Sequence, residues 1–461
     1  MKLELVATAA FGLEAVVRRE IEALGYKVLK TEDGRVTYMG DERAVVRSNL
    51  WLRSADRVYI RMGEFTAPEF EELFQQVRAI EWESVIPLEG AFPVVGGSVK
   101  SALHSVPACQ KIIKKAVSVR LADFYCRETM PETGAEYRIR FLAHKNSFLM
   151  LMDTSGAGLH KRGYRVRDVA APIKETLAAA LVQLSFYRSD RVLIDPCCGS
   201  GTIPIEAAMI ARDIAPGLSR SFASEEWDMI PPEVWKQERK LAFTRMRIGS
   251  AGFAMNGSAA NSANAQSRGG AAAENGTDSG RMRAAKGGTA DNAAERSSSN
   301  TPKEAATLKT AERTVPVRSS APGPLRITAM DIDRRAAAAA RANAEEAGVA
   351  DDIDIVCMDM TKWQPGAGIP KGVSKEEHAV VISNLPYGKR VGDDSGIAAV
   401  YAHIRDIMEE CPNWSFFLIT SDKNIERELG RKADRRRKLY NGTIETQFYQ
   451  FHGAKPGRSR E

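Results

Sequence analysis

Residues 192–202 read VLIDPCCGSGT, and a mostly apolar run follows at 203–211. This pattern predicts a short buried strand that ends in an acid, a glycine-rich turn, and a helix that starts at once. Glycines in such a turn let a ligand approach the backbone, and the helix N-terminus presents free N–H groups. No Gly-Lys-Ser/Thr follows, and G-x-G-x-x-G is missing, so neither a P-loop nor a dinucleotide fingerprint is indicated. A plain tight turn between strand and helix explains these residues equally well.

Strands and helices alternate on the C-terminal side of this turn. Strands are expected at residues 325–330, 353–357, 379–383 and 415–420, and helices at residues 173–186, 334–346 and 397–410. A final hairpin is expected across Asn441-Gly442. This order predicts an α/β fold with a doubly wound parallel sheet, in which ligands bind at the carboxyl ends of the strands.

Three acids follow three successive strands of this sheet. Asp195 would repel a pyrophosphate but suits a ligand that carries an ammonium group. Asp331 can accept hydrogen bonds from both ribose hydroxyls, with a helix N-cap as the alternative, a role that Asp333 fits better. Asp359 can accept from an adenine amino group while Met360 packs on the ring; a loop acid beside a core methionine is the alternative.

The three acids together match S-adenosylmethionine, which has an amino acid moiety, a ribose and an adenine but no phosphate. We therefore expect S-adenosylmethionine as the cofactor. The predicted cofactor-binding residues are Asp195, Cys197, Gly199, Ser200, Gly201, Thr202, Asp331, Asp359 and Met360.

A second motif, Asn384-Leu385-Pro386-Tyr387, follows the fourth strand and suits a flipped nucleobase. The aromatic ring gives the base a face to stack on. The Asn384 side-chain carbonyl and a neighbouring main-chain carbonyl can accept both hydrogens of an exocyclic amine and aim its lone pair at the methyl group. No metal is required. The four residues are the predicted catalytic residues, and a proline-rigid turn with a packed tyrosine is the alternative.

The sequence resembles the bacterial THUMP-domain class I RNA methyltransferases, a group that includes the 23S rRNA guanine-N2 methyltransferases. The resemblance covers nearly the whole chain outside residues 249–322. It is carried by DTSG at 153–156, LHKRGYR at 159–165, APIKETLA at 171–178, DPCCGSGT at 195–202, IEAA at 205–208 and APGL at 215–218.

The resemblance implies a Rossmann-like class I methyltransferase with a seven-stranded sheet, preceded by an α+β N-terminal region with a THUMP domain. It divides the chain into a ferredoxin-like region at 1–55, a THUMP domain at 56–165, and a methyltransferase domain at 166–461. Leu385 stands where the commoner motif has proline, so φ is not fixed there, although related THUMP methyltransferases also carry leucine.

RNA is the expected partner, and the resemblance points to 23S rRNA or a ribosome-assembly intermediate. The net charge is 65 − 59 = +6, which is compatible with an anionic partner but does not require one. The candidate RNA-binding residues are Lys161, Arg162, Arg165 and Arg390. For each, a solvated surface charge is the alternative. No segment reaches 18 apolar residues, so we expect no membrane segment. The cysteines show no disulfide pattern and the start shows no signal peptide, so we expect a cytoplasmic location. We expect no obligate protein partner.

Two other functions remain open at this point. The acceptor motif does not separate guanine N2 from adenine N6, so an N6-adenine methyltransferase acting on DNA or RNA is one alternative. A non-catalytic RNA-binding ribosome-assembly factor is another, motivated by Leu385 and the basic clusters. The exact target nucleotide and the oligomeric state do not follow from the sequence.

Residues 249–322 interrupt the predicted catalytic sheet between its first two strands. They are almost wholly Ala, Gly, Ser, Asn, Thr and Arg, with Phe253 as the only aromatic residue. Such a segment cannot bury enough apolar surface to offset the chain entropy lost on folding. We expect a disordered insert that can be deleted without unfolding the protein.

Overall fold

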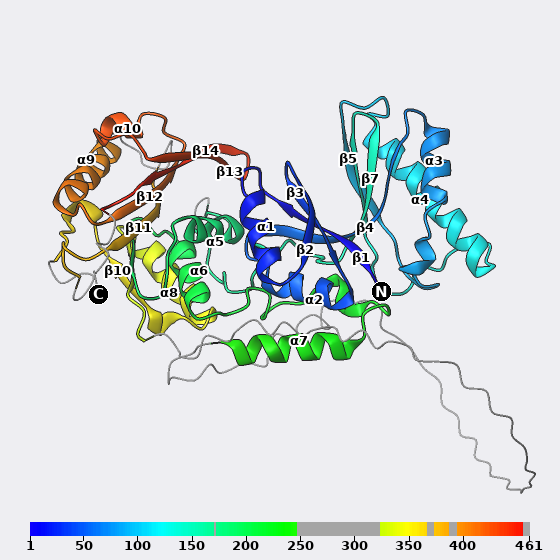
Figure 1. Cartoon of the computed structure of the whole chain (residues 1–461), viewed down its shortest axis with the longest axis horizontal. Coiled ribbons are helices and arrows are strands. Elements are labelled where there is room, and N and C mark those ends of the chain that lie inside the picture. The colour runs from blue at the N-terminus through cyan, green and yellow to red at the C-terminus, as the bar shows by residue number, and fades with distance from the viewer. Residues whose placement is uncertain (170–171, 247–322, 367–372, 387–393, 455–461) are drawn as a thin grey trace, which may run out of the picture. The chain divides into compact units, whose positions relative to one another are not determined.

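The computed structural model describes residues 1–169, 172–246, 323–366, 373–386 and 394–454 (Figure 1). The insert expected at 249–322 lies outside the described residues. The described chain is built on two seven-stranded sheets.

The first sheet has the strand order β2-β3-β1-β4-β7-β6-β5. Its strands are β1 (Leu3–Ala9), β2 (Lys27–Glu32), β3 (Arg35–Gly40), β4 (Ala55–Thr66), β5 (Val94–Val99), β6 (Ile139–His144) and β7 (Ser147–Asp153). The long strand β4 pairs with β1 through its first half and with β7 through its second half. One sheet therefore runs through both regions that were predicted at 1–55 and 56–165.

The helices of this part are amphipathic and cover the sheet with their apolar faces. They are α1 (Glu14–Ala23), α2 (Glu42–Trp51), α3 (Phe70–Arg78), the short 3-10 helix η1 (Trp82–Ser84) and α4 (Val106–Tyr125). In α1 the buried residues are Val16, Val17 and Ile21, as the helical spacing predicts. The Asp41 side chain caps α2 by accepting from the Ala44 amide.

Strand β5 is an element that the sequence pattern did not predict. Its centre is Gly96-Gly97, and glycine is depleted in strands. A Cβ at Gly96 would lie 2.4 Å from the Phe141 carbonyl oxygen, so the close approach of β6 requires glycine.

The second sheet has the order β10-β9-β8-β11-β12-β14-β13, which confirms the predicted Rossmann-like class I methyltransferase fold with a seven-stranded sheet. Its strands are β8 (Val192–Asp195), β9 (Ile327–Asp331), β10 (Ile353–Cys357), β11 (Ala379–Asn384), β12 (Ser415–Thr420), β13 (Arg435–Asn441) and β14 (Ile444–Phe451). The first five in this order are parallel, and β14 runs antiparallel to β12 and β13. The carboxyl ends of the parallel strands consequently share one edge.

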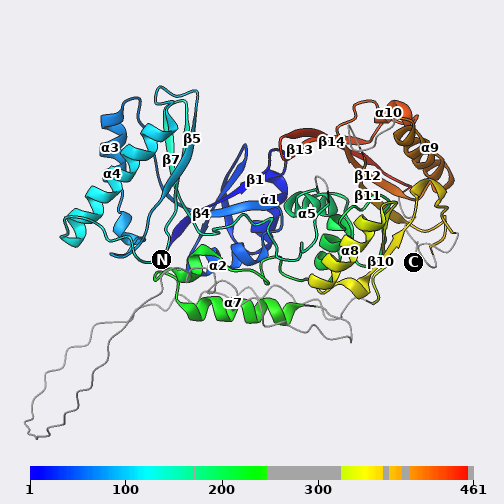
Figure 2. The same cartoon turned by 180° about the vertical axis from the view of Figure 1, so that it is seen from behind.

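Helices cover both faces of this sheet (Figures 1 and 2). They are α5 (Glu175–Leu184), α6 (Thr202–Ala211), α8 (Arg334–Glu346), η3 (Ala350–Asp352), η4 (Met360–Lys362), α9 (Asp394–Glu410) and α10 (Ile425–Glu428). Two further elements, η2 (Ala223–Glu226) and α7 (Pro232–Arg245), belong to the first sheet's region instead: α7 packs on α2, and the Ser224 hydroxyl of η2 donates to the Thr154 carbonyl after β7. Within β8, Leu193 belongs to the core that contains α5, α6 and α8, whereas Ile194 belongs to the core that contains α9. Strands buried on both faces explain the unbroken apolar runs in the sequence.

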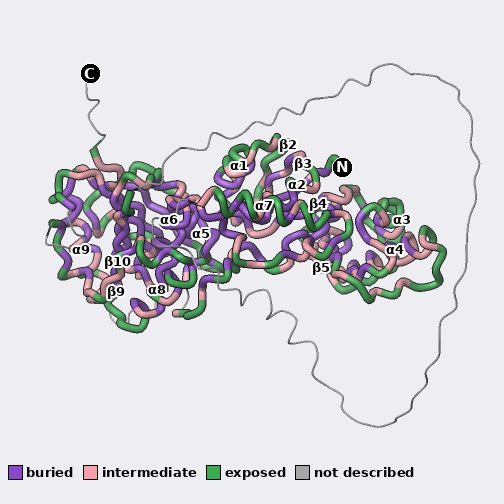
Figure 3. Tube along the Cα trace, turned by 90° about the horizontal axis from the view of Figure 1, so that it is seen from below, coloured by how far each residue is buried: buried purple, intermediate pink, exposed green. Residues whose placement is uncertain are grey.

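Helices α5 and α6 are buried along nearly their whole length (Figure 3). Helix α5 also contacts α1 of the first sheet's region, and the Gln183 amide of α5 donates to the Ser54 hydroxyl at 3.2 Å. Helix α5 is apolar on all of its faces because it packs against other elements on several sides.

Candidate active site

A cavity of about 520 Å³ lies at the carboxyl ends of β8, β9, β10 and β11. It brings together most of the predicted site residues. Those that line it are Asp195, Cys197, Gly199, Ser200, Thr202, Asp331, Asp359, Met360, Asn384 and Pro386. Gly201 and Leu385 do not line the cavity.

Asp195, the last residue of β8, is almost completely buried at the floor of the cavity, with 1% of its surface exposed. Its Oδ1 accepts hydrogen bonds from the Ser383 hydroxyl at 2.7 Å and from the Cys197 amide at 3.2 Å. Burial raises the pKa of Asp195 to about 7, although both hydrogen bonds act in the opposite direction. Ser383 is a site residue that sequence analysis missed, because the pairing of β8 with β11 is not visible in the sequence.

The two glycines of the turn have different roles. Gly201 has φ +81°, and a Cβ there would lie 2.9 Å from the Ala340 Cβ of α8, so glycine permits the close packing of α6 on α8. Gly199 has φ +55° and donates its amide to Asp331 Oδ2 at 2.8 Å. Only Gly199 faces the cavity.

Asp331 binds the turn as well as lining the cavity. Its Oδ1 accepts from the Asp333 amide at 2.9 Å, and burial raises the pKa of the Asp331 carboxyl. Asp333 caps α8 through the Arg335 amide at 2.8 Å, as the sequence predicts. The Asp331 carboxylate therefore lies at the cavity wall, and Asp333 rather than Asp331 caps the helix.

The sequence left two roles open for Asp359 and Met360: residues that contact an adenine, or a loop acid beside a core methionine. Both residues line the cavity and also have the contacts of the second role. Asp359 Oδ1 accepts from the Thr361 hydroxyl at 2.8 Å and the Thr361 amide at 3.0 Å, which lowers the pKa of Asp359 and caps η4. Met360 is buried in the core that contains α9, yet it also lines the cavity. Ile332, which is 70% exposed, adds an apolar wall that sequence analysis did not identify.

Asn384 presents an unsatisfied acceptor. Its Oδ1 is buried and has no hydrogen-bond partner among the described residues. A buried acceptor without a partner costs free energy, so an arrangement that keeps one beside a cavity suits a ligand donor. Leu385 is fully buried in the core, and its amide donates to the Ile419 carbonyl at 3.2 Å. Packing and this β12 contact hold the backbone where the commoner motif has proline.

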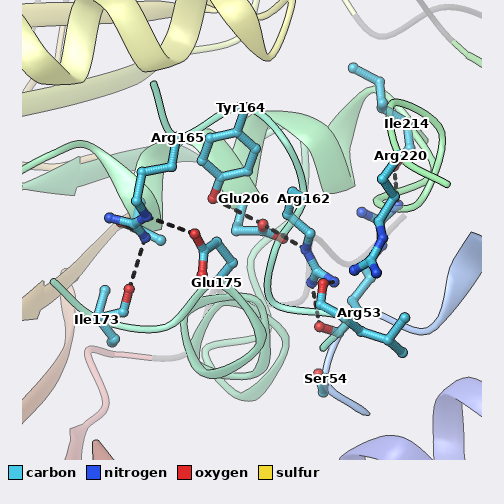
Figure 4. Close-up of polar contacts among 12 residues, drawn as sticks. Arg53, Ser54, Arg162, Tyr164, Arg165, Ile173, Glu175, Glu206, Ile214 and Arg220 are labelled. Carbon is cyan, nitrogen blue, oxygen red and sulfur yellow. Dashed lines mark hydrogen bonds and ion pairs between the residues drawn. The ribbon is translucent and has the colours of Figure 1, made fainter. Parts of the chain in front are cut away.

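Arg162 is not placed to bind RNA, which corrects the prediction from the sequence (Figure 4). It is 3% exposed, and its guanidinium donates to Glu206 Oε1 at 3.3 Å, to the Leu159 carbonyl at 2.7 Å and to the Arg53 carbonyl. The Tyr164 hydroxyl also donates to Glu206 Oε1, at 3.1 Å. The residue therefore joins the segment after β7 to α6, with no face left for a phosphate.

Arg165 needs the same correction. It donates to the Ser200 hydroxyl at 2.9 Å and the Thr202 hydroxyl at 3.1 Å, and its Nε donates to Glu175 Oε1 at 2.7 Å. The guanidinium thus supports the glycine-rich turn from behind. Neither Glu175 nor Glu206 was predicted as a partner, although an acid in an apolar helix is itself a sign of a buried cation.

Asn343 of α8 is a further supporting residue that the sequence pattern did not reveal. Its Oδ1 accepts from the amides of Val166 and Arg167, and its Nδ2 donates to the Ser200 carbonyl at 3.1 Å. The junction segment and the turn are therefore held by one side chain.

The ligand-binding roles of the residues that line the cavity remain predictions, and so do the roles of three further residues. Lys161 is exposed, which leaves its amine accessible to a phosphate. Tyr387 and Arg390 lie outside the described residues.

A family model described as an RMKL-like methyltransferase domain matches residues 162–450, more than half of the chain. The chain belongs to this family. Two further models match in the order predicted: an RlmL ferredoxin-like domain at residues 4–59 and a THUMP domain at residues 67–153. These matches confirm the resemblance that the sequence motifs carry.

Relatives match the RMKL-like chain over almost its full length. A Bacillus subtilis (strain 168) protein named "Putative RNA methyltransferase YpsC" is 38% identical over 98% of this chain and 96% of its own. A solved structure from Listeria monocytogenes str. 4b F2365, described as a "predicted N6-adenine-specific DNA methylase", is 37% identical with a TM-score of 0.76, over 98% of this chain and 97% of its own. The structure of SMU.472, "a putative methyltransferase complexed with SAH", is 34% identical with a TM-score of 0.77, over 99% of both chains.

None of the helices among the described residues is long and apolar enough to cross a membrane.

Proposed function

We propose that this RMKL-like methyltransferase transfers a methyl group from S-adenosylmethionine to an exocyclic base amine of RNA, and that the amine is guanine N2 of 23S rRNA. The observation that carries the proposal is Asn384, whose Oδ1 is buried without a partner and which lines the same cavity as Asp195, Asp331 and Asp359.

The residues present fit S-adenosylmethionine. The cavity offers three carboxylates at successive strand ends and no basic side chain among its described lining residues, so it suits a ligand with an ammonium group and hydroxyls but no phosphate. Asp195 would hold the ammonium, Asp331 the ribose hydroxyls and Asp359 the adenine amine, beside the apolar surfaces of Ile332 and Met360. When bound, this cofactor supplies an electrophilic methyl group on a sulfonium centre.

The chain's own residues then act by positioning. Asn384 Oδ1 accepts one hydrogen of the base amine and orients the nitrogen lone pair toward the methyl group. Satisfying that acceptor offsets part of the cost of extruding the base. Tyr387 offers the base a stacking face. Neither role needs a covalent intermediate, so geometry supplies much of the rate.

The THUMP match supports RNA as the substrate. A labelled-methyl assay on rRNA from a strain that lacks the protein, followed by mass-spectrometric mapping, tests the proposal. We expect one methylated guanine in 23S rRNA, and no product from Asn384→Ala, although this variant still binds S-adenosylhomocysteine. If Asn384→Ala and Asp195→Ala leave the modification of rRNA in cells intact, a non-catalytic RNA-binding role replaces the enzyme.

An N6-adenine methyltransferase is the second candidate, because the description of the Listeria relative names that activity and both amines fit the same acceptor. The assay separates the two, since it would then yield N6-methyladenine. Parallel reactions with DNA identify the nucleic acid.

A further inference from the structure

A second concave site lies away from the active-site cavity. It is a groove of about 360 Å³ where α1, the end of α5 and the edge strand β13 meet. Its lining residues are Ala15, Arg19, Leu184, Phe186, Arg435, Arg436, Arg437 and Gln450. The groove shares no described lining residue with the active-site cavity, and nothing in the proposed chemistry uses it.

Four arginines line this groove, and its described lining contains no acid. Arg19, Arg435 and Arg436 are exposed, whereas Arg437 is half-buried and donates to the Gly12 carbonyl at 2.7 Å. Arg436 has one ion pair outside the groove, with Glu426 at 3.4 Å. Like charges gathered around one hollow repel each other, and a bound polyanion relieves that repulsion.

Phe186 adds an aromatic surface to the same groove. It is 56% exposed, and its φ is +56°, the left-handed region that follows many helices and that glycine or asparagine normally occupies. An exposed aromatic ring in a conformation that disfavours side chains contributes little to folding. A ring beside cations is the usual platform for a nucleobase.

We propose that this groove binds a single-stranded segment of the RNA substrate, with its phosphates on Arg19 and Arg435 and one base stacked on Phe186. The occupant is a nucleic acid rather than an acidic protein or a bilayer, because the groove combines cations with an exposed ring over an apolar floor at Leu184, which is 6% exposed. The inference rests on the proposed function only in taking RNA as the substrate.

The test uses the full chain and a fluorescein-labelled single-stranded oligo(rA) of about 15 nucleotides, with binding followed by anisotropy over a range of salt concentrations. Arg19→Gln/Arg435→Gln removes two groove cations. Its matched control is Arg18→Gln/Arg427→Gln, which removes two exposed guanidiniums that do not line the groove. We expect the groove pair to weaken binding about tenfold at low salt and to reduce the salt slope by about 1.4, as for two phosphate contacts on a single strand. The control pair changes neither quantity appreciably.

The stacking role has its own readout. Phe186→Asn removes the ring but suits the left-handed backbone, so we expect roughly tenfold weaker binding with an unchanged or higher Tm. Phe186→Trp should bind oligo(rA) as tightly as the parent chain, unlike Phe186→Asn, and oligo(rA) should quench the fluorescence of the added tryptophan. A purely structural role of Phe186 predicts the opposite result, a lower Tm with unaltered RNA binding.

Several outcomes overturn the groove proposal. One is an equal loss of affinity for oligo(rA) in the groove pair and the control pair. Another is no loss of affinity in either pair. A third is binding that depends on the groove but is to phosphatidylserine vesicles in place of oligo(rA). The groove variants must keep the affinity of the parent chain for S-adenosylhomocysteine. If instead the parent chain methylates no RNA but oligo(rA) still depends on the groove, the proposed function fails and the groove proposal stands.

Discussion

At the scale of single residues, the site depends on polar atoms whose folded environment is unfavourable until a ligand arrives. Asn384 holds an unpartnered acceptor, and Asp195 is a buried carboxyl with a pKa near 7. Groups of this kind reduce the stability of the free protein and favour binding. Two predictions follow for Asp195.

The affinity for S-adenosylhomocysteine should depend on pH through Asp195. An ammonium group requires the carboxylate, and with a free-state pKa of about 7 the carboxyl must lose a proton on binding at lower pH. We expect the association constant to fall about tenfold for each pH unit below 7. Calorimetry between about pH 5.5 and 7 measures the slope. Asp195→Asn should bind more weakly and without this slope; an equal slope in the variant would assign the dependence to another group.

Asp195→Asn should stabilise the free protein at high pH. The folded pKa of about 7 lies above the ordinary value of 3.8, so the contribution of this carboxyl is fully present below pH 3.8 and is lost as pH rises through 7. At pH 8 a charge is buried, and the variant removes it at a gain of up to about 4 kcal/mol. Thermal unfolding at pH 5 and pH 8 tests this. An advantage of the variant that is no larger at pH 8 than at pH 5 contradicts the assignment.

At the scale of elements, the segment that follows β7 is hydrogen-bonded both to the start of α6 and to the loop after α2. Arg162 and Arg165 are only three residues apart, yet each bonds to a different acid of the catalytic domain, Glu206 of α6 and Glu175 of α5. This explains why a strongly basic run in the sequence contributes mainly to structure.

Arg165→Gln should weaken cofactor binding more than it slows transfer. It removes charge-assisted bonds to Ser200 and Thr202 that hold the glycine-rich turn. We expect the KM for S-adenosylmethionine to rise about tenfold, while kcat changes by less than about threefold, because uniform binding is lost. Arg167→Gln is the control, since Arg167 is an exposed neighbour whose described contacts are made by its backbone. A matching rise in the control would point to a general charge effect.

Arg162→Met should be strongly destabilising, because it leaves Glu206, with 0% exposure, without its cation. The expected loss is about 3–5 kcal/mol in urea unfolding at neutral pH. Adding Glu206→Gln should restore part of this stability, since the Tyr164 hydroxyl can still donate to the amide oxygen. Strictly additive losses in the double variant would show that the two side chains are not coupled.

At the scale of the whole molecule, buried contacts tie the first-sheet region to the catalytic domain. The Arg53 guanidinium donates to the Ile214 carbonyl at 2.8 Å, and the Arg162 guanidinium donates to the Arg53 carbonyl. Burial raises the pKa of Glu20, whose carboxylate is bonded by Gln183 and Ser54. Polar groups buried in this way lose their partners if either part unfolds alone.

We therefore expect the two parts to unfold in one cooperative transition. Differential scanning calorimetry of the full chain should show a single peak with equal calorimetric and van't Hoff enthalpies. In Arg53→Ala the coupling is weakened, so the peak should broaden or split. Two separated peaks in the parent chain would mean that the buried contacts do not couple the parts.

How much of a residue's role could be predicted from the sequence differs from one residue to the next. Asp333 at the helix cap and the glycine-rich turn were predictable, because each is decided by neighbours within a few positions along the chain. The roles of Arg162 and Arg165 were mispredicted, since a basic run reads the same whether it faces solvent or a buried acid. Their acidic partners, Glu206 and Glu175, lie 44 and 10 residues away, and no local pattern indicates these pairings.

The sequence was enough to predict the strands of the catalytic sheet, the sheet edge that carries the site, and the family, because periodicity and local motifs are short-range properties of the chain. The tertiary structure alone decided which charges are buried. It brings Ser383 to Asp195, leaves Asn384 without a partner, and closes the basic groove around Phe186. Burial and pairing depend on which distant segments meet, and that is set only when the sheets and helices pack.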